Sequence, residues 1–310
     1  MRLIRGLHNL KPEHQGCVAT IGNFDGIHRG HQRILASLKA EAARLSLPVT
    51  AIIFEPQPRE YLNPSQAPGR LTSFAEKLYW FKKLGVDQLL CLYFDHKLQQ
   101  LSADDFINQV LVNGLQVKHL VVGDDFRFGC DRSGDFNKLT EAGLRDGFVV
   151  KPTETVTTND GRRISSTRIR KVIVAGDFQQ AEQLLGHPFQ ICGKVVHGQK
   201  LGRQLGVPTA NIRPNRTQLP CSGVFAVKVT VNHKLHYGVA NLGIRPTVDG
   251  RKSSLEVHLF DFQGSLYGQR LVVEFLQKIR DEKAFSGLPE LQAAIQQDIN
   301  VARNLLIAQL

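Results

Sequence analysis

The chain has 310 residues, of which 42% are hydrophobic and 22% are charged, and this is ordinary for a globular protein with room for two domains. Its formal net charge is +11, but the lysines and arginines are dispersed, without a run of five or six. This distribution disfavours a nucleic-acid-binding surface and suits nucleotides or other phosphorylated small molecules as partners.

Cysteine usage and hydropathy indicate the expected cellular setting. The five cysteines are odd in number and far apart, and no Cys-x-x-Cys pair occurs. We therefore expect neither a disulfide framework nor a structural zinc site. The sequence shows no signal peptide and no apolar run long enough to span a bilayer. These features predict a cytoplasmic protein that does not bind membranes.

The first pattern along the chain joins a strand, three glycines and a helix. The apolar run 17–21 predicts a buried strand, and residues 32–45 carry apolar side chains at helical spacing. This layout binds phosphate, because the free N–H groups of the first helical turn point at the anion. His28 and His31 can both face that anion and stabilise a phosphoryl-transfer transition state, as cations or as hydrogen-bonding groups. The alternative is two surface histidines in a glycine-rich turn.

The N-terminal half alternates between strand-like and helix-like segments. Expected strands are 18–21, 49–54, 89–94 and 119–122, and expected helices run from Ser73 to Gly85 and from Ser102 to Gly114. Such alternation predicts a parallel sheet with helices on both faces. Ligands of such sheets lie at the carboxyl ends of the strands, which is where His28 falls.

Two further segments follow strands at the same edge. Pro56 and Pro58 make a stiff extended loop after the second strand, or simply end it. Asp125 and Phe126, in segment 123–129, suit a flavin or a nucleotide base, but the same segment also suits a packed turn.

Segment 164–170, Ile-Ser-Ser-Thr-Arg-Ile-Arg, carries a stronger signal. It follows a hairpin turn expected at 159–161 and opens a helix with good N-cap residues. Arg168, Arg170 and Lys171 oppose the helix dipole there, so they are a poor choice for stability alone. They are reasonable if a polyphosphate docks on this helix end. The segment then forms a second phosphate site, facing the first, for the leaving pyrophosphate.

The hydrophobic period changes near residue 186. Alternating strands are expected at 190–197, 224–231, 235–241, 254–260 and 270–279, which suggests a small antiparallel barrel. A final helix carries an apolar stripe for packing on the barrel, formed by Leu288, Leu291, Ile295, Ile299, Ala302 and Leu306.

Two places in this C-terminal half carry candidate chemistry. Segment 198–211 is basic and glycine-rich and ends in Thr209 and Asn211, whose oxygens suit Mg²⁺. The alternative is a mobile surface loop. Glu256 lies in an alternating strand, where a carboxylate usually faces solvent, but it is a fit general base if it faces the same cavity.

Several of these motifs resemble known families. His28-Arg-Gly-His31, after Gly22-Asn23-Phe24-Asp25, resembles the signature of the HxGH nucleotidyltransferases, which join a nucleoside triphosphate to a phosphate or carboxylate and release pyrophosphate. Segments 208–211 and 241–247, together with Glu256, resemble the riboflavin kinases. With segment 164–170 in the same order, residues 15–305 resemble the prokaryotic bifunctional riboflavin kinase/FAD synthetases.

This resemblance implies an α/β fold with two domains. Residues 1–185 would form a Rossmann-like FMN adenylyltransferase domain with a parallel sheet, and residues 186–310 a small antiparallel riboflavin kinase β-barrel with a C-terminal helix. The barrel would phosphorylate riboflavin to FMN with ATP and Mg²⁺, and the N-terminal domain would adenylylate FMN to FAD. The implied partners are these small molecules, without nucleic acid or membrane, in a monomer or weak homo-oligomer.

The resemblance also assigns site residues. Those implied to bind ATP for adenylylation are Gly22, Asn23, Phe24, Asp25, His28, His31, Arg163, Ser166, Thr167 and Arg170. Those implied to bind flavin or nucleotide in the same site are Pro56, Pro58, Asp125 and Phe126. Those implied to bind ATP in the kinase site are Gly193, Lys200, Gly202, Gly206, Pro208, Thr209 and Asn211.

The implied roles differ between the two sites. Glu256 is the base for the ribityl hydroxyl, and Thr209 and Asn211 hold the metal with ATP, while His28 and His31 act on the phosphates during adenylylation. One departure from the family pattern is Gln57, which stands where many members carry histidine.

Two rival functions remain at this point. The first is a single-activity nucleotidyltransferase whose barrel only binds a ligand; Glu256 with Thr209 and Asn211 argues against it, because a passive module does not need them. The second is a nucleic-acid-binding protein, which predicts a concentrated basic and aromatic surface, whereas aromatic residues make up only 7% of the chain.

Overall fold

The computed structural model describes residues 1–123, 125–198, 202, 205–232, 234–247 and 250–307. The chain divides into two compact units. The first comprises Met1–Pro68 and Phe74–Ile164, and the second comprises Gly69–Ser73 and Ser165–Leu310. The predicted domain boundary at residues 185 and 186 stays a prediction.

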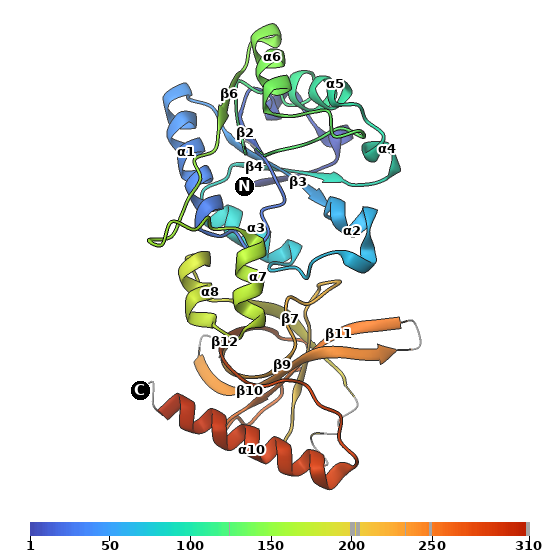
Figure 1. The fold of residues 1–310 in the computed structure, drawn as a ribbon, viewed down its shortest axis with the longest axis vertical. Helices are drawn as coiled ribbons and strands as arrows, with labels where there is room; N and C mark the ends of the chain where they lie inside the picture. Colours follow the sequence, from blue (N-terminus) through green and yellow to red (C-terminus); the bar gives the residue numbers. More distant parts are fainter. Residues whose placement is uncertain (124, 199–201, 203–204, 233, 248–249, 308–310) are drawn as a thin grey trace. The chain divides into compact units, whose positions relative to one another are not determined.

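The first unit is built on a six-stranded parallel sheet with strand order β1-β4-β3-β2-β5-β6 (Figure 1). Its strands are β1 (Arg2–Arg5), β2 (Val18–Ile21), β3 (Val49–Glu55), β4 (Gln88–Tyr93), β5 (His119–Val122) and β6 (Val149–Pro152). The predicted parallel sheet is confirmed, and its four central strands were expected. The two edge strands, β1 and β6, were not.

Helices cover both faces of this sheet. They are α1 (Arg29–Leu45), α2 (Pro58–Leu62), α3 (Phe74–Lys83), α4 (His96–Gln99), α5 (Ala103–Phe106), a π-helical segment (Ile107–Val112) and α6 (Phe136–Asp146). Short 3₁₀ turns cover Leu7–Asn9, Pro12–His14 and Pro64–Gln66.

Strand side chains alternate between two apolar cores. In β3, Ala51 and Ile53 pack with α1 and α3, whereas Ile52 and Phe54 pack with α5, the π-helical segment and α6. The helix expected from Ser102 to Gly114 differs from the prediction. It consists of an α-helical segment, Ala103–Phe106, followed by a π-helical segment that ends at Val112.

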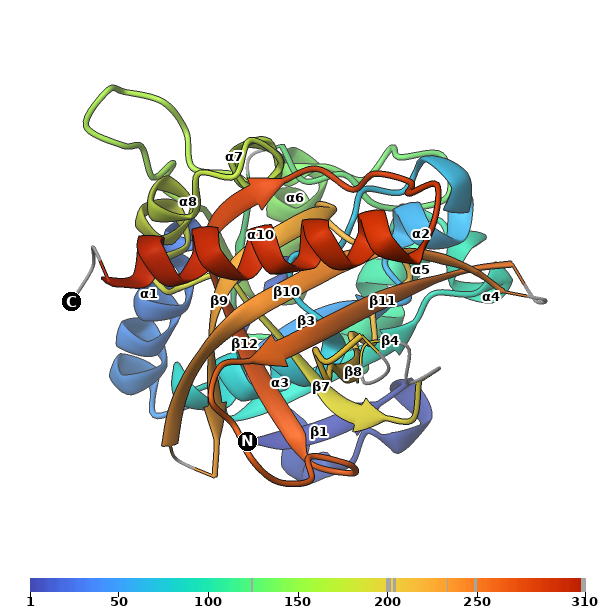
Figure 2. The same ribbon diagram turned by 90° about the horizontal axis from the view of Figure 1, so that it is seen from below.

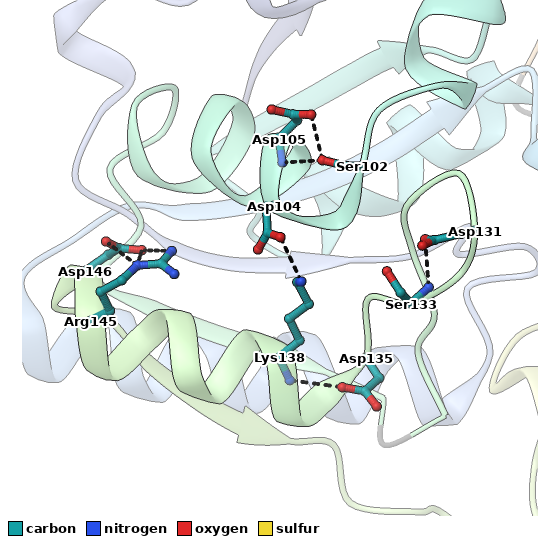
Figure 3. Close-up of polar contacts among 9 residues, drawn as sticks. All are labelled: Ser102, Asp104, Asp105, Asp131, Ser133, Asp135, Lys138, Arg145 and Asp146. Carbon is teal, nitrogen blue, oxygen red and sulfur yellow. Dashed lines mark hydrogen bonds and ion pairs between the residues drawn. The ribbon is translucent and has the colours of Figure 1, made fainter.

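Polar contacts fix α5 and α6 on their face of the sheet (Figure 3). Ser102 caps α5 by accepting a hydrogen bond from the N–H of Asp105 at 3.0 Å, and Asp135 caps α6 by accepting one from the N–H of Lys138 at 2.9 Å. The Lys138 ammonium then reaches Asp104 on α5 at 2.8 Å. These caps satisfy N–H groups that a helix start leaves without partners.

The second unit contains a closed six-stranded barrel with strand order β10-β11-β8-β7-β12-β9, and its paired strands are antiparallel. The strands are β7 (Gln190–Val196), β8 (Ala210–Arg213), β9 (Gly223–Val231), β10 (Lys234–Thr247), β11 (Gly250–Leu259) and β12 (Arg270–Arg280). The predicted antiparallel barrel is confirmed. β8 was not expected, because it lies at the end of a glycine-rich segment.

Three helices of the second unit are α7 (Ser166–Val174), α8 (Phe178–Leu185) and α10 (Leu288–Ile307). Phe178 of α8 packs its ring 5.7 Å from that of Phe225 and 5.8 Å from that of Phe275, so α8 belongs to the barrel core. Figure 2 shows α10 lying across the barrel strands, where Ala302 is fully buried. Leu288, expected in its apolar stripe, is instead 54% exposed at the helix start.

Candidate active sites

The two histidines of the first unit meet at the start of α1. His28 is the N-cap residue, and its Nδ1 accepts a hydrogen bond from the N–H of His31 at 3.4 Å. The two rings stack with centroids 3.7 Å apart and planes 18° apart. Gly30 permits this packing, because a Cβ atom there would lie only 3.1 Å from the His28 ring. The histidines therefore flank the helix end at which an anion is stabilised.

The surroundings of His31 keep its ring neutral. Part of the residue reaches solvent, but its Nδ1 is buried and makes no hydrogen bond within the described part of the chain. Burial lowers the pKa of His31 well below its ordinary value of 6.5, and repulsion from His28 and from the fully buried Lys77 acts in the same direction. Of the two roles expected for the pair, His31 is thus suited to hydrogen bonding rather than to carrying a charge.

The segment after β3 differs from the expected extended loop. The Glu55–Pro56 peptide bond is cis, and Pro58 is the first residue of α2, a position where its missing N–H has no cost. Gln57 between the prolines is only 6% exposed, and its Nε2 is buried without a hydrogen-bond partner among the described residues. Its backbone N–H donates to Glu60 at 2.9 Å.

Asp125 and Arg163 lie together although 38 positions separate them. Their side chains form an ion pair at 3.2 Å, and both are more than half exposed, so solvent screens the attraction. The expected hairpin holds Arg163, which pairs with Thr157 across the turn. Phe126 stacks on the buried Phe128 at 5.5 Å, so segment 123–129 is in part the packed turn considered as an alternative.

The residues expected at the second phosphate site belong to the second unit. Ser165 caps α7 by accepting a hydrogen bond from the N–H of Arg168 at 3.3 Å, which places Ser166 and Thr167 in the first turn. The guanidinium of Arg170 donates to the carbonyl of Gly69 at 2.6 Å. Arg170 thus has a structural contact, and the assignment of these residues to ATP stays a prediction.

The barrel unit contains a cavity of about 240 Å³ that brings three expected residues together. Thr209, Asn211 and Glu256 all line it. Glu256 on β11 lies directly opposite Asn211 of β8 on one side and opposite Asn241 of β10 on the other. Opposite residues of neighbouring strands project from one face of a sheet, about 5 Å apart at Cβ. The glutamate therefore faces the same cavity as the Thr209–Asn211 motif.

Two glycines of the glycine-rich segment 198–211 pack tightly beside the side chains of Asn211 and Thr209. A Cβ atom at Gly198 would lie 2.4 Å from Nδ2 of Asn211, and one at Gly202 would lie 2.5 Å from the Val207 carbonyl and 3.2 Å from Oγ1 of Thr209. Gly202 also lines the cavity. Among the described residues of this segment, Gly198 and Gly202 are therefore packed against the motif, and the mobile-loop alternative stays open for the segment as a whole, because residues 199–201, 203 and 204 lie outside the described residues.

Other expected kinase residues have different surroundings. Lys200 lies outside the described residues. Gly193 is inside β7, where a Cβ atom would lie 2.2 Å from the Arg213 carbonyl, so strand packing is sufficient reason for it. Gly206 has a φ of 76°, which favours glycine, and the Pro208 carbonyl contacts Nδ1 of His258 at 2.9 Å. Their roles in ATP binding stay predictions.

The cavity also contains residues that the sequence did not single out for a role. His258 follows Glu256 on the same face of β11, and Glu282 comes from the segment after β12. Arg280 lines the cavity and binds Asp298 of α10 through two hydrogen bonds of 2.9 and 2.8 Å. Period-two spacing could have indicated His258, but no local pattern relates Glu282 to a strand 26 residues earlier.

Comparisons with known proteins agree on both units. The FAD synthetase family model matches residues 10–168, and the riboflavin kinase family model matches residues 185–306. The chain is 54% identical over 306 residues to a bifunctional riboflavin kinase/FMN adenylyltransferase of Pseudomonas fluorescens, covering 98% of each chain. It is 49% identical over 305 residues to the protein so named from Escherichia coli, covering 98% of this chain and 97% of that one.

One solved structure resembles the whole fold. It is a crystal structure described as a macrolide-efflux protein from Streptococcus pneumoniae, 32% identical, with a TM-score of 0.78 and coverage of 98% of this chain and 99% of that one. Within the part of this chain that the structure describes, no helix has the length and apolar character needed to cross a bilayer.

Proposed function

The chain belongs to the bifunctional riboflavin kinase/FMN adenylyltransferase family, and we propose that it phosphorylates riboflavin to FMN and then adenylylates FMN to FAD. The observation that carries this proposal is the shared cavity of Thr209, Asn211 and Glu256, in a barrel matched by the riboflavin kinase family. It argues against the rival function in which the barrel only binds a ligand, because a passive module does not need a carboxylate beside a phosphate-binding motif.

In the kinase reaction, Glu256 acts on the terminal hydroxyl of the ribityl chain. The hydroxyl oxygen attacks the γ-phosphorus of ATP, its proton passes to the Glu256 carboxylate, and ADP leaves. A primary alcohol is a weak nucleophile, so a carboxylate that orients it and accepts its proton lowers the barrier to its attack. We assign the backbone of Gly202, which packs against Thr209, to the binding of the phosphates.

The donor set of this cavity fits magnesium. Within the described residues, no group of three or more His, Cys, Asp or Glu side chains is arranged to hold a metal ion. Mg²⁺ nevertheless needs few protein ligands, because it keeps several waters and binds substrate phosphates. The oxygens of Thr209 and Asn211 would hold it, and when bound it would neutralise phosphate charge.

In the adenylylation reaction, the first unit positions ATP at the start of α1. A phosphate oxygen of FMN attacks the α-phosphorus of ATP, the bond to the bridging oxygen of the β-phosphate breaks, and pyrophosphate leaves. His28 and His31 stand at the helix end and bind the phosphates there, together with backbone N–H groups. Since the pKa of His31 is depressed, this histidine contributes hydrogen bonds and not a permanent charge.

For the flavin of this second reaction, we assign the segments after β3 and β5. The ring of Phe126 is half-exposed and already stacks on Phe128, so it offers an aromatic surface to an isoalloxazine ring. Pro56 and Pro58 bracket Gln57, whose buried Nε2 is a donor without a partner in the described chain. A flavin carbonyl oxygen would satisfy it.

Product analysis tests the proposal. The purified protein is incubated with riboflavin, ATP and magnesium, and FMN and FAD are separated and identified. Formation of both supports the assignment. Formation of FAD from supplied FMN, without FMN from riboflavin, would support the single-activity rival and contradict the assignment of the barrel.

We also propose a cytoplasmic location and small molecules as the partners. None of the five cysteines, all of which lie within the described residues, forms a disulfide, and this supports a reducing compartment. A monomer or weak homo-oligomer without bound nucleic acid remains our expectation, and light scattering with and without added RNA measures both.

A further inference from the structure

The kinase chemistry proposed above uses Asn211 and Glu256 but leaves Asn241 without a role. Asn241 completes the row of three polar side chains across β8, β11 and β10. It lines the same cavity, on the opposite side of Glu256 from Asn211. An amide beside the catalytic carboxylate matters for the reaction only if its orientation is fixed, because its two ends have opposite hydrogen-bonding character.

Glu282 fixes that orientation. Oε1 of Glu282 lies 1.9 Å from the Cβ position of residue 243, two residues from Asn241 on the same face of β10, so the carboxylate lies beside the Asn241 amide. The Asn241 side chain lowers the pKa of the Glu282 carboxyl group, as a hydrogen-bond donor does. An ionised carboxylate only accepts hydrogen bonds, so the amide nitrogen of Asn241 must be the donor. The amide is planar, with nitrogen and oxygen on different sides of its carbon. Its Oδ1 therefore turns away from Glu282 and remains an acceptor.

Gly243 provides the space that Glu282 occupies. It lies two residues after Asn241 on β10, and therefore on the same face of the strand. A Cβ atom at this position would lie 1.9 Å from Oε1 of Glu282, far inside a contact distance. Its backbone does not have the positive φ that favours glycine. A side chain at position 243 would therefore displace the Glu282 carboxylate from its place beside β10.

We propose that Glu282 is a positioning residue of the kinase site, which holds the Asn241 amide so that Oδ1 receives a ribityl hydroxyl next to the one bound by Glu256. The two acceptors then sit side by side on neighbouring strands, and consecutive hydroxyl groups of the polyol can donate to them. This inference rests on the proposed kinase function and adds the recognition of the polyol chain to it.

The environment of Glu282 is consistent with this role. Glu282 lines the cavity and stays exposed to solvent, while partial burial of its carboxyl group raises its pKa. The neighbouring Arg280 is engaged with Asp298, so it holds α10 on the barrel.

A double-mutant cycle tests the proposal. We expect Glu282→Ala to lower kcat/KM for riboflavin about tenfold, the scale of one lost hydrogen bond to a charged group, with KM for ATP unchanged. Asn241→Ala should lower it at least as much, and the double variant should be no worse than Asn241→Ala alone. Additive losses, or an unchanged Glu282→Ala variant, would overturn the proposal.

Two further variants separate positioning from general stability. Glu282→Gln keeps an oxygen that can accept from Asn241, so it should retain most riboflavin use. Gly243→Ala should behave like Glu282→Ala, and adding Glu282→Ala to it should cost nothing more. If Glu282→Gln is as impaired as Glu282→Ala, charge and not orientation matters, and the proposal fails.

The controls keep this outcome distinct from failure of the proposed function. Asp281→Ala changes an adjacent carboxylate that is 85% exposed and pairs with Lys278 outside the cavity, and it should use riboflavin as the parent does. All assays are run below the lowest melting temperature of the set. Lack of FMN formation by the parent protein would refute the kinase assignment itself, whereas normal formation by every variant refutes only the role of Glu282.

Discussion

The imidazole rings of His28 and His31 stack 3.7 Å apart at the start of α1, and the N–H of His31 donates to Nδ1 of His28. One histidine therefore caps the helix and orients the other. This arrangement gives the pair a structural function in addition to the proposed catalytic one, and the two can be separated by experiment.

Removing His31 should abolish most adenylylation. We expect His31→Ala to lower FAD formation from FMN by roughly 10²-fold, because a preorganised stabiliser of developing charge is lost. FMN formation from riboflavin by the same sample should be unchanged, and His96→Ala, an exposed histidine of the same unit, serves as the matched control. Normal FAD synthesis by His31→Ala would remove this residue from the site.

The depressed pKa of His31 predicts a pH dependence of stability. The unfolded chain protonates His31 near its ordinary value of 6.5, whereas the folded chain resists protonation until the pH is well below that value. In this window the unfolded state binds more protons, so the free energy of unfolding falls as the pH falls. His119, whose pKa is also lowered by burial, acts in the same direction.

Fluorescence of the single tryptophan, Trp80 in the first unit, can follow this effect. We expect the melting temperature of this unit to decline between about pH 7 and about pH 5, and to decline less in His31→Gln, which cannot titrate. Identical slopes in the two proteins would contradict the depressed pKa.

Arg170 should prove to have both a structural and an electrostatic role. Arg170→Ala loses the hydrogen bond to the Gly69 carbonyl, so we expect the unfolding free energy to fall by about 1 kcal/mol. If the residue also binds polyphosphate, KM for ATP in FAD synthesis rises in this variant. Arg170→Lys keeps the charge and should restore ATP use without full stability. A loss of stability with unchanged ATP use in both variants would make Arg170 structural only.

Glu256→Gln should separate the two activities. The change keeps the size of the side chain and removes its basicity, so FMN formation should drop by about 10²–10⁴-fold while FAD formation from supplied FMN persists. Glu274→Gln is the matched control, since Glu274 lies on β12 and pairs with Lys228 at 2.7 Å. If Glu256→Gln phosphorylates riboflavin normally, another group is the base.

The second unit includes residues from Ser165 onward, and this predicts the stability and activity of fragments that begin at different residues. A fragment of residues 165–310 keeps Phe178 in the barrel core, whereas one of residues 186–310 removes a side chain that is only 4% exposed. Burial of one such ring contributes about 1.5–3 kcal/mol. We therefore expect the longer fragment to melt at a higher temperature by circular dichroism, and to make FMN but no FAD. Equal melting temperatures would show that α8 adds nothing to the barrel.

Local patterns in the sequence determined the elements with strong periodicity. The bounds of β2 and β5 were predicted to the residue, and the start of α3 to within one, because apolar runs and capping residues act over a few positions. The parallel sheet and the antiparallel barrel followed from the order of these elements, whereas the family resemblance came from the residues of the motifs themselves. The short edge strands were missed: β1 is flanked by arginines, and β6 ends in proline, so neither resembles a buried strand.

Only the tertiary structure decided the neighbours, burial and protonation of the candidate site residues. The row of Asn211, Glu256 and Asn241 depends on the register of three strands, and register depends on the whole closed barrel. Glu282 lies beside Gly243 of β10 although it follows the end of β12, so no local spacing relates it to Asn241. The neutral state of His31 likewise arises from burial and from the charge of Lys77 on another helix. Residue types specify which chemistry is available, and long-range packing sets distance, burial and charge, which decide how it is used.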